Sequence, residues 1–263
     1  MRTPTVARTT VTRTAVAAAL TAALALGGAA TATAVSATAA PAPDDGWTGE
    51  GGLSLSREDN QHVDAYLDRA QEAEKSISPQ VRAAAWITGA ELTGFDHRLK
   101  SPDSLKRKVA TSLKEHPEQN VDTVLAGISD AVRYTLQWPD EQYTEGVATA
   151  TRLLSDWGND STKWSNTWGR SEGYKGLNTG WRAPRSGQLF EVQFHTPASK
   201  WAQEATHKLY EEQRLPGTSP ERKKELQAQQ NAIFASVPVP PGADRLTAPG
   251  PVRLPAPAPL GRG

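Results

Sequence analysis

The sequence contains no cysteine among its 263 residues. Disulfide bonds, thiolate nucleophiles and cysteine-based zinc sites are therefore excluded. No acidic residue precedes Asp44, and no second apolar run follows the one near the N-terminus. A membrane-spanning helix needs roughly 20 strongly apolar positions, so we expect a soluble protein once the N-terminal segment is removed.

The N-terminal segment has the order of a secretory signal peptide. Three arginines come first, an Ala- and Leu-rich run follows from residue 14 to about residue 30, and an A-x-A sequence stands at residues 37–39. A membrane anchor is the alternative, but the run is short and poor in large apolar residues. We predict cleavage before Ala40 and a secreted, extracellular protein without a membrane contact.

The charge balance gives no sign of a nucleic-acid partner. The chain has 29 basic and 29 acidic residues, and loss of residues 1–39 leaves 26 against 29, a net charge of −3. Such a balance does not favour general binding to nucleic acid or membranes. Basic side chains that act in function must therefore act in local clusters. The oligomeric state stays open.

Composition divides the chain into four segments. Residues 1–39 are the predicted signal peptide, and residues 40–52 are expected to form a flexible leader. Residues 238–263 hold eight prolines and few large apolar residues, which predicts a disordered or polyproline-like tail. A single domain is left over residues 53–237.

Helical and strand patterns alternate within that domain. Helices are expected to begin at the capping residues Ser56, Ser78, Ser101, Thr196 and Ser219. Strands are expected over residues 95–100, 131–138 and 190–196, and a long loop over residues 158–173. This order predicts an α/β (α+β) fold in which helices pack on a mixed sheet.

The strand at residues 190–196 alternates cleanly between two kinds of side chain. The two sets are Phe190, Val192 and Phe194 on one face and Glu191, Gln193 and His195 on the other. One interpretation is a half-buried strand with a wet outer face. The other is a row of carboxylate, amide and imidazole that faces a cleft, where it could bind a metal and activate a hydroxyl.

A basic cluster precedes that strand in the chain. Arg98 and Lys100 would share one face of a short strand, and Ser104 and Lys108 are four apart on one helix face. A strand that turns into a helix can aim all four at one anion, beside the helix N-terminus. A solvated basic helix face is the alternative interpretation.

Four segments in order resemble the synthetase domain of the RelA/SpoT family. Arg98, Lys100, Ser104 and Lys108 fit the family's R-x-K-x-x-x-S-x-x-x-K donor motif. Residues 129–134 are similar to its strand with an acid and an arginine, residues 173–178 to its G-Y acceptor loop, and residues 191–196 to its E-x-Q-x-x-T strand. The resemblance covers most of residues 92–214, and a signal peptide is typical of the family's secreted actinomycete members.

The resemblance implies a nucleotidyltransferase-like sheet and a pyrophosphokinase, which would transfer pyrophosphate from ATP to the 3′-hydroxyl of a purine nucleotide and release AMP. Asp130 and Glu191 would hold Mg²⁺ or another divalent cation, and Glu191 would be the base. The donor-binding residues would be Arg98, Lys100, Ser104, Lys108 and Arg133. The acceptor-binding residues would be Tyr174, Lys163, Asn178, Gln193 and His195.

The sequence also departs from the family pattern. Asp130 and Arg133 are closer together than usual, and alternation places them on opposite faces of a regular strand, so Asp130 must lie at the strand's entry or in a bulge. Asn178 and His195 stand where histidine and arginine are common, which could relax the choice of acceptor. A secreted nucleotide-binding pseudoenzyme and a cell-wall interaction module remain alternatives.

Overall fold

The computed structural model describes residues 45–215 and 217–250. All of these residues belong to one compact unit. The predicted signal peptide, its cleavage site and residues 251–263 of the predicted tail lie outside the described residues. No helix within the described ranges is long and apolar enough to cross a membrane.

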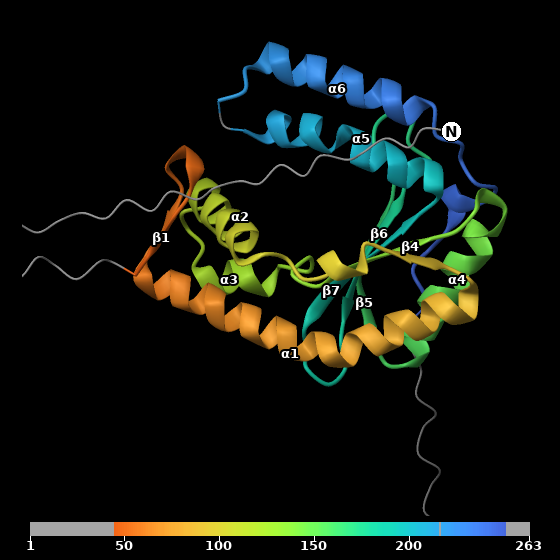
Figure 1. Cartoon of the computed structure of the whole chain (residues 1–263), viewed down its shortest axis with the longest axis horizontal. Coiled ribbons are helices and arrows are strands. Elements are labelled where there is room, and N and C mark those ends of the chain that lie inside the picture. The colour runs from red at the N-terminus through yellow and green to blue at the C-terminus, as the bar shows by residue number, and fades with distance from the viewer. Residues whose placement is uncertain (1–44, 216, 251–263) are drawn as a thin grey trace, which may run out of the picture. The chain divides into compact units, whose positions relative to one another are not determined.

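A five-stranded mixed sheet organises the described chain (Figure 1). Its strands run in the order β3-β4-β7-β6-β5. Only β4 and β7 are parallel, and the other neighbours are antiparallel. The strand bounds are β3 Glu91–Thr93, β4 Arg133–Gln137, β5 Asp160–Asn166, β6 Leu177–Arg182 and β7 Leu189–His195. The predicted mixed sheet packed with helices is confirmed.

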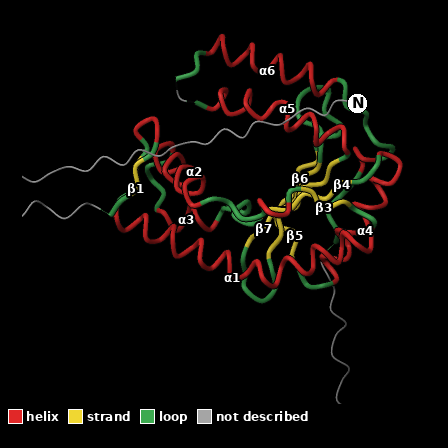
Figure 2. The backbone as a smooth tube through the Cα atoms, in the orientation of Figure 1, coloured by secondary structure: helices red, strands yellow, loops and turns green. Residues whose placement is uncertain are grey.

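Helices lie on two sides of this sheet. In Figures 1 and 2, α5 and α6 run side by side, and α1 crosses on the opposite side of the strands. The helix bounds are α1 Arg57–Thr88, α2 Pro102–Glu115, α3 Val121–Ala126, α4 Asp140–Asp156, α5 Pro197–Arg214 and α6 Pro220–Ala235. Two short strands, β1 Trp47–Thr48 and β2 Ser54–Leu55, pair ahead of α1.

Four of the five predicted helix starts are confirmed. The side chains of Ser56, Ser101, Thr196 and Ser219 each accept a hydrogen bond from the backbone N–H three residues later. The fifth prediction is wrong, because α1 continues through Pro79. Ile77 and Val81, on either side of the proline, are both buried at 1% exposure or less. Packing of this face therefore outweighs the hydrogen bond that proline cannot donate.

One strand prediction and one loop prediction also need correction. Residues 95–97 form a 3-10 helix after Gly94, whose φ of 63° turns the chain, and only Leu99 bridges to Val132 in the predicted strand. The predicted loop over residues 158–173 contains β5, which pairs along β6. Its polar sequence carries no alternation, so hydrogen bonding to a neighbour rather than its own pattern makes it a strand.

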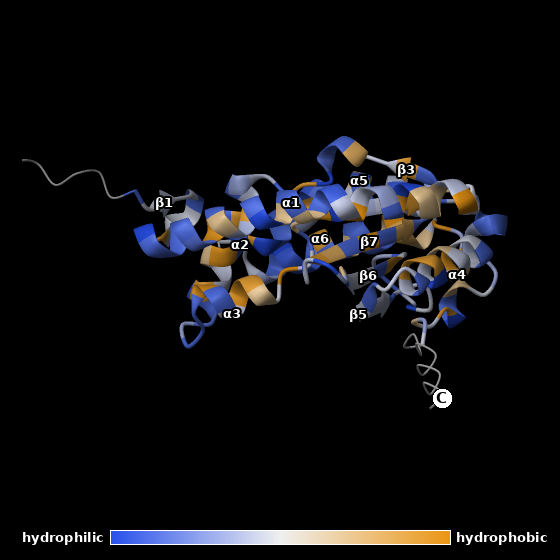
Figure 3. Ribbon diagram, turned by 90° about the horizontal axis from the view of Figure 1, so that it is seen from below, coloured by the Kyte–Doolittle hydropathy of each residue, from blue (hydrophilic) through white to orange (hydrophobic). Residues whose placement is uncertain are grey.

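The sheet has one apolar and one polar face. Tyr134, Leu136, Phe190, Val192, Phe194, Leu177 and Trp181 share the apolar face and are at most 2% exposed. The buried stripe of α4, Tyr143, Val147, Ala150 and Leu154, belongs to the same core. Figure 3 shows such stripes as orange segments beside blue ones on α3 and α4. The alternate residues of the strands, Glu191 among them, lie on the other face.

Parts of the predicted leader and tail are ordered. Trp47 in the leader lies in β1 and packs partly buried against the core. In the tail, Ala243 is fully buried in a 3-10 helix, and the Asn166 side-chain amide donates to the Ala243 carbonyl over 2.8 Å. At these positions, contacts with the body of the fold supply the apolar surroundings that the composition of the leader and tail lacks.

Candidate active site

Glu191 stands in a row of residues that crosses the polar face of the sheet. The register pairs Glu191 with Arg133 on β4 and with Gly180 on β6, and Gly180 in turn with Lys163 on β5. A Cβ at Gly180 would come within 3.1 Å of the Lys163 Cβ. The glycine thus allows Lys163 to lie close against β6 next to Glu191, and the side chains of Arg133 and Lys163 are exposed.

Glu191 is held from its own strand and from α5. The side-chain amide of Gln193 donates to Glu191 Oε1 over 2.7 Å, and Gln203 on α5 donates to Gln193 Oε1 over 3.3 Å. Burial raises the pKa of the Glu191 carboxyl, and the charge of Asp130 raises it further against the opposing effects of Gln193, Arg133 and Lys163. A carboxyl with a raised pKa is suited to act as a general base near neutral pH.

Asp130 lies in the turn before β4, at the strand entry that the sequence predicts. Its two oxygens accept from Lys100 Nζ over 3.0 Å and from Lys108 Nζ over 2.6 Å. Burial alone would raise the pKa of Asp130, but the hydrogen bond from Lys108 and the charges of both lysines hold it at about 2. Asp130 therefore stays ionised, and it brings together two of the predicted phosphate-binding cations.

Arg98 does not share the surroundings of Lys100, contrary to the expectation of one common face. Its Nε donates to Glu74 Oε1 on α1 over 2.6 Å, and its guanidinium lies 4.3 Å from the centre of the Phe95 ring. Arg98 has helical rather than extended backbone angles, φ −65° and ψ −26°, which explains the difference from a strand residue. A pocket of about 340 Å³ opens here between α1 and the 3-10 helix.

Ser104 lies in the first turn of α2, where its hydroxyl accepts from Ser101 Oγ over 2.8 Å. The Ser104 side chain is exposed, and so is Lys108 one turn later. The predicted convergence on one anion thus has a structural basis for Lys100 and Lys108, which share Asp130. Nothing in the structure brings Arg98 to the same point.

The acceptor residues predicted on β6 and β7 form a hydrogen-bonded group. The Tyr174 hydroxyl donates to Asn178 Oδ1 over 2.8 Å and lies 3.0 Å from His195 Nε2. His195 has no exposed surface, so the prediction of its direct contact with an acceptor is wrong. The outer face of the strand is not wet, because α5 covers it at this end, with Ser199 Oγ 2.9 Å from His195 Nδ1.

Two acids are the available metal ligands in this group. Among the described residues, no cluster of three or more His, Asp or Glu side chains could hold a metal ion. Asp130 and Glu191 nevertheless lie in each other's field, and a divalent cation would relieve that repulsion. Mg²⁺ is commonly held by one or two carboxylates together with substrate phosphates, so this donor set fits Mg²⁺ bound together with a nucleotide.

Several residues of the site were missed at the sequence level. Glu74 is 7% exposed among the apolar residues Ala70, Ala73 and Ile77 of α1, and an acid inside an apolar stripe is a signal that could have been found. Gly180 and Gln203 gave no such signal, because their importance lies in what faces them across the sheet and from α5.

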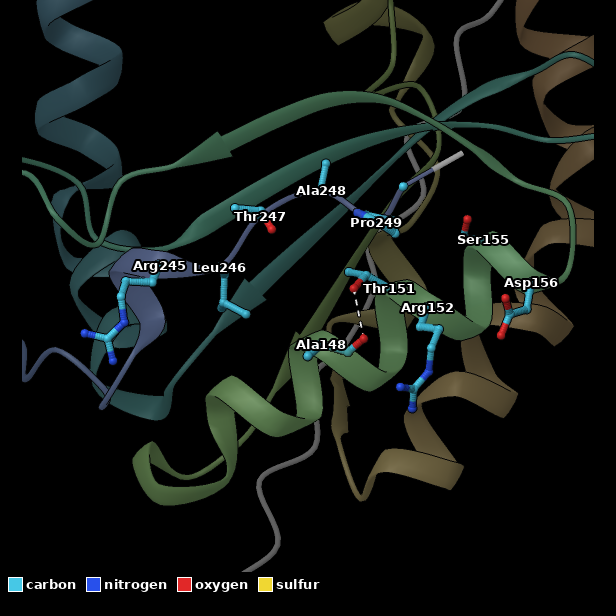
Figure 4. A pocket seen from close by; sticks show the side chains of 11 residues that line it. Ala148, Thr151, Arg152, Ser155, Asp156, Arg245, Leu246, Thr247, Ala248 and Pro249 are labelled. Carbon is cyan, nitrogen blue, oxygen red and sulfur yellow. Dashed lines mark hydrogen bonds between the residues drawn. The ribbon is translucent and has the colours of Figure 1, made fainter. Parts of the chain in front are cut away.

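A second pocket, of about 590 Å³, lies away from these groups (Figure 4). Ala148, Thr151, Arg152, Ser155 and Asp156 of α4 line one side, and residues 245–250 line the other. Figure 4 shows the two sets facing each other. None of the predicted site residues lines this pocket, and it brings no pair of neighbouring acids together, so we do not place the chemistry here.

The comparisons with known proteins found structural neighbours that include a small alarmone synthetase and a GTP pyrophosphokinase family protein. One is small alarmone synthetase 1 from Bacillus subtilis bound to its product pppGpp, with 14% identity, a TM-score of 0.48, and coverage of 66% of this chain and 91% of that chain. Another is a GTP pyrophosphokinase family protein from Streptococcus pneumoniae, with 16% identity, a TM-score of 0.45, and coverage of 68% and 89%. No family model and no curated protein matches the sequence. Because identities this low bear at most on the fold, we argue function from the site residues.

Proposed function

We propose that the chain is a secreted pyrophosphokinase that transfers the β,γ-pyrophosphate of ATP to the 3′-hydroxyl of purine nucleotides. The products would be AMP and nucleotides of the (p)ppGpp and (p)ppApp type. One observation carries the proposal: Asp130, which joins Lys100 and Lys108 in ion pairs, lies close enough to Glu191 for its charge to act on that carboxyl. A proton acceptor, an acid that is ionised at neutral pH and paired cations are suited to phosphoryl-type transfer, which is catalysed mainly by positioning and charge stabilisation.

The donor triphosphate would bind to the cations that Asp130 holds. Lys100 and Lys108 come from two elements and meet at one carboxylate, so their ammonium groups are already close together for a polyanion. The exposed side chains of Ser104 and Arg133 would add to donor binding. Arg98 would stack on the donor base from the pocket that it shares with Phe95. Asp130 and Glu191 would hold Mg²⁺ together with the phosphates, and the chemistry that the metal would supply is neutralisation of charge on the transferring group.

The acceptor would lie over the row of Glu191, Gly180 and Lys163. Tyr174 would contact its base, with Asn178 beside it, and Lys163 would meet its phosphates. Glu191 takes the proton of the 3′-hydroxyl, and the oxygen forms a bond to the β-phosphorus of ATP. The bond breaks between the β-phosphorus and the oxygen that bridges it to the α-phosphorus, and that oxygen leaves as part of AMP.

One incubation tests the proposal directly. The purified protein is mixed with ATP, GTP and Mg²⁺, and the nucleotides are separated by anion exchange. We expect AMP and a 3′-pyrophosphorylated nucleotide in equal amounts. Nucleotide binding without product would favour a secreted pseudoenzyme, and neither binding nor product would favour a cell-wall interaction module.

Secretion is a separate part of the proposal and rests on the N-terminal sequence alone. N-terminal sequencing of protein from a culture supernatant should begin at Ala40 or within a few residues of it. Material that retains Met1 would contradict export with cleavage.

A further inference from the structure

His195 is buried on every side but remains hydrogen-bonded at both ring nitrogens. Nδ1 lies 2.9 Å from Ser199 Oγ on α5, and Nε2 lies 3.0 Å from the Tyr174 hydroxyl. Burial, assisted by the charge of Lys200, lowers the pKa of the imidazole to about 3. The ring is therefore neutral at physiological pH, so one nitrogen donates and the other accepts.

The hydrogen bonds that connect Tyr174, His195 and Ser199 can run in only two directions. In the first, Tyr174 donates to Asn178 Oδ1 and accepts from His195 Nε2, while Nδ1 accepts from Ser199. In the second, Tyr174 gives up its hydrogen bond to Asn178 and donates to Nε2, and Nδ1 donates to Ser199, whose own hydrogen goes to the Thr196 carbonyl 3.2 Å away. Both orders need both ring nitrogens of His195.

Both ends of this series of hydrogen bonds make further contacts. Thr196 and Ser199 form the capping box of α5, in which each side chain accepts from the other's backbone N–H over 3.3 and 3.0 Å. Phe234 from α6 packs edge-on to Tyr174 with 5.7 Å between ring centres. A Cβ at Gly176 would lie 2.8 Å from the Tyr174 hydroxyl, so the loop backbone also closes on the tyrosine.

We propose that His195 is a positioning residue that links the Tyr174 ring to the N-terminus of α5 and thereby sets the affinity for the acceptor nucleotide. The inference rests on the proposed function, since it takes Tyr174 as the acceptor contact. His195 itself touches no nucleotide. Its loss leaves the tyrosine hydroxyl with Asn178 alone and removes the link from the ring to α5, although Phe234 still packs against the ring.

Two amide substitutions separate the ends of the chain of hydrogen bonds. Glutamine places its terminal amide near the position of Nε2, and asparagine places its amide near Nδ1. His195→Asn therefore keeps a partner for Ser199 but loses Tyr174, whereas His195→Gln keeps a partner for Tyr174. With GTP as acceptor at saturating ATP, we expect His195→Asn to raise the KM for GTP about three- to tenfold, as for one lost hydrogen bond.

The other readouts distinguish positioning from general damage. The KM for ATP as donor, measured at saturating GTP, should change less than twofold, a difference small against one hydrogen bond. His195→Gln should recover part of the GTP affinity, and the effect of His195→Asn should disappear in a Tyr174→Phe background, because the two residues act as one unit. His207→Asn, on the exposed side of α5, is the matched control and should leave both KM values unchanged.

The outcomes keep this inference separate from the proposed function. Equal rises in both KM values, a fall in kcat alone, or additive effects in the Tyr174→Phe background would overturn the positioning role. Absence of product from the wild-type protein would overturn the proposed function instead. If His195→Asn does not fold, Ser199→Ala breaks the same chain at its other end and should still raise the KM for GTP selectively; an unchanged ratio of the two KM values in that variant would also overturn the role.

Discussion

Asp130 raises the pKa of the Glu191 carboxyl, although its own pKa is held at about 2. The difference lies in their partners. Asp130 pairs with two lysines, whereas Glu191 forms no ion pair within 4.0 Å among the described residues and takes its hydrogen bond from an amide. Two neighbouring acids whose pKa values move apart are suited to different tasks. Under the proposed function, the ionised Asp130 would organise the cations, and Glu191 would accept the proton.

The first prediction concerns Glu191→Gln. The variant keeps the shape and the hydrogen bond from Gln193 but cannot accept the proton of the 3′-hydroxyl. Turnover should fall by about 10²–10⁴-fold, the usual cost of losing a general base, while nucleotide binding survives. Product formation is measured by anion exchange, with Glu145→Gln, exposed on α4, as the control. Retention of more than about a tenth of wild-type turnover would be well outside that range and would remove Glu191 from the chemistry.

The same substitution should change the pH dependence of stability. The folded-state pKa of Glu191 is raised above its ordinary value of 4.5, so the folded state holds this proton more tightly than the unfolded state does. Stability is therefore lost as the pH rises from 4.5 through the folded-state pKa. Glu191→Gln should be at least as stable as the wild type at pH 7.5, and this advantage should shrink toward pH 4.5. Urea unfolding at several pH values measures the difference in free energy of unfolding between the variant and the wild type. A difference that grows in favour of the variant on acidification would contradict the burial argument.

Asp130→Asn should separate binding from turnover. The substitution releases Lys100 and Lys108 from their ion pairs and removes a negative charge that repels phosphate. In EDTA, the variant should bind ATP more tightly than the wild type, while its Mg²⁺-dependent turnover collapses. Titration calorimetry measures ATP binding. The control is Asp122→Asn, which loses an exposed contact with His62. Weaker ATP binding in EDTA would show that these lysines do not contact the donor.

Acceptor choice should be broad. Tyr174 is the group proposed to contact the acceptor base, and stacking on an aromatic ring is tolerant of base identity. Adenine and guanine nucleotides should both accept pyrophosphate, with ATP able to serve as donor and acceptor. Competition between GTP and ATP as acceptors measures the preference. Activity confined to guanine acceptors would reveal a base-reading group elsewhere in the site.

Truncation of the C-terminal segment should lower stability. A chain that ends at Val237 loses the buried Ala243 and the hydrogen bond from Trp164 Nε1 to the Leu246 carbonyl, which is 3.0 Å long. These lost contacts should lower the free energy of unfolding by about 2 kcal/mol. The Tm should therefore be roughly 5 °C below that of a chain that ends at Gly250. Equal Tm values would mean that residues 238–250 behave as the disordered tail their composition suggests.

Local features of the fold could be predicted from the sequence. Ser101, Thr196 and Ser219 cap helices because each needs only a side-chain oxygen within three residues of an N–H. The alternation over residues 190–196 marks β7, because the side-chain period of a strand is fixed by its backbone. The placement of Asp130 ahead of its strand also followed from that period.

The sequence by itself determined where the helices begin, which strand carries Glu191, and which residue types the site offers, because these depend on neighbours within a few positions. Tertiary structure decided that Lys100 and Lys108 share Asp130, that Arg98 turns to Glu74 instead, and that His195 stands behind Tyr174. Lys100 and Asp130 are 30 positions apart, and Tyr174 and His195 are 21. Such pairings, and the burial that shifts their pKa values, arise only when α1, α2, the sheet and α5 are packed together.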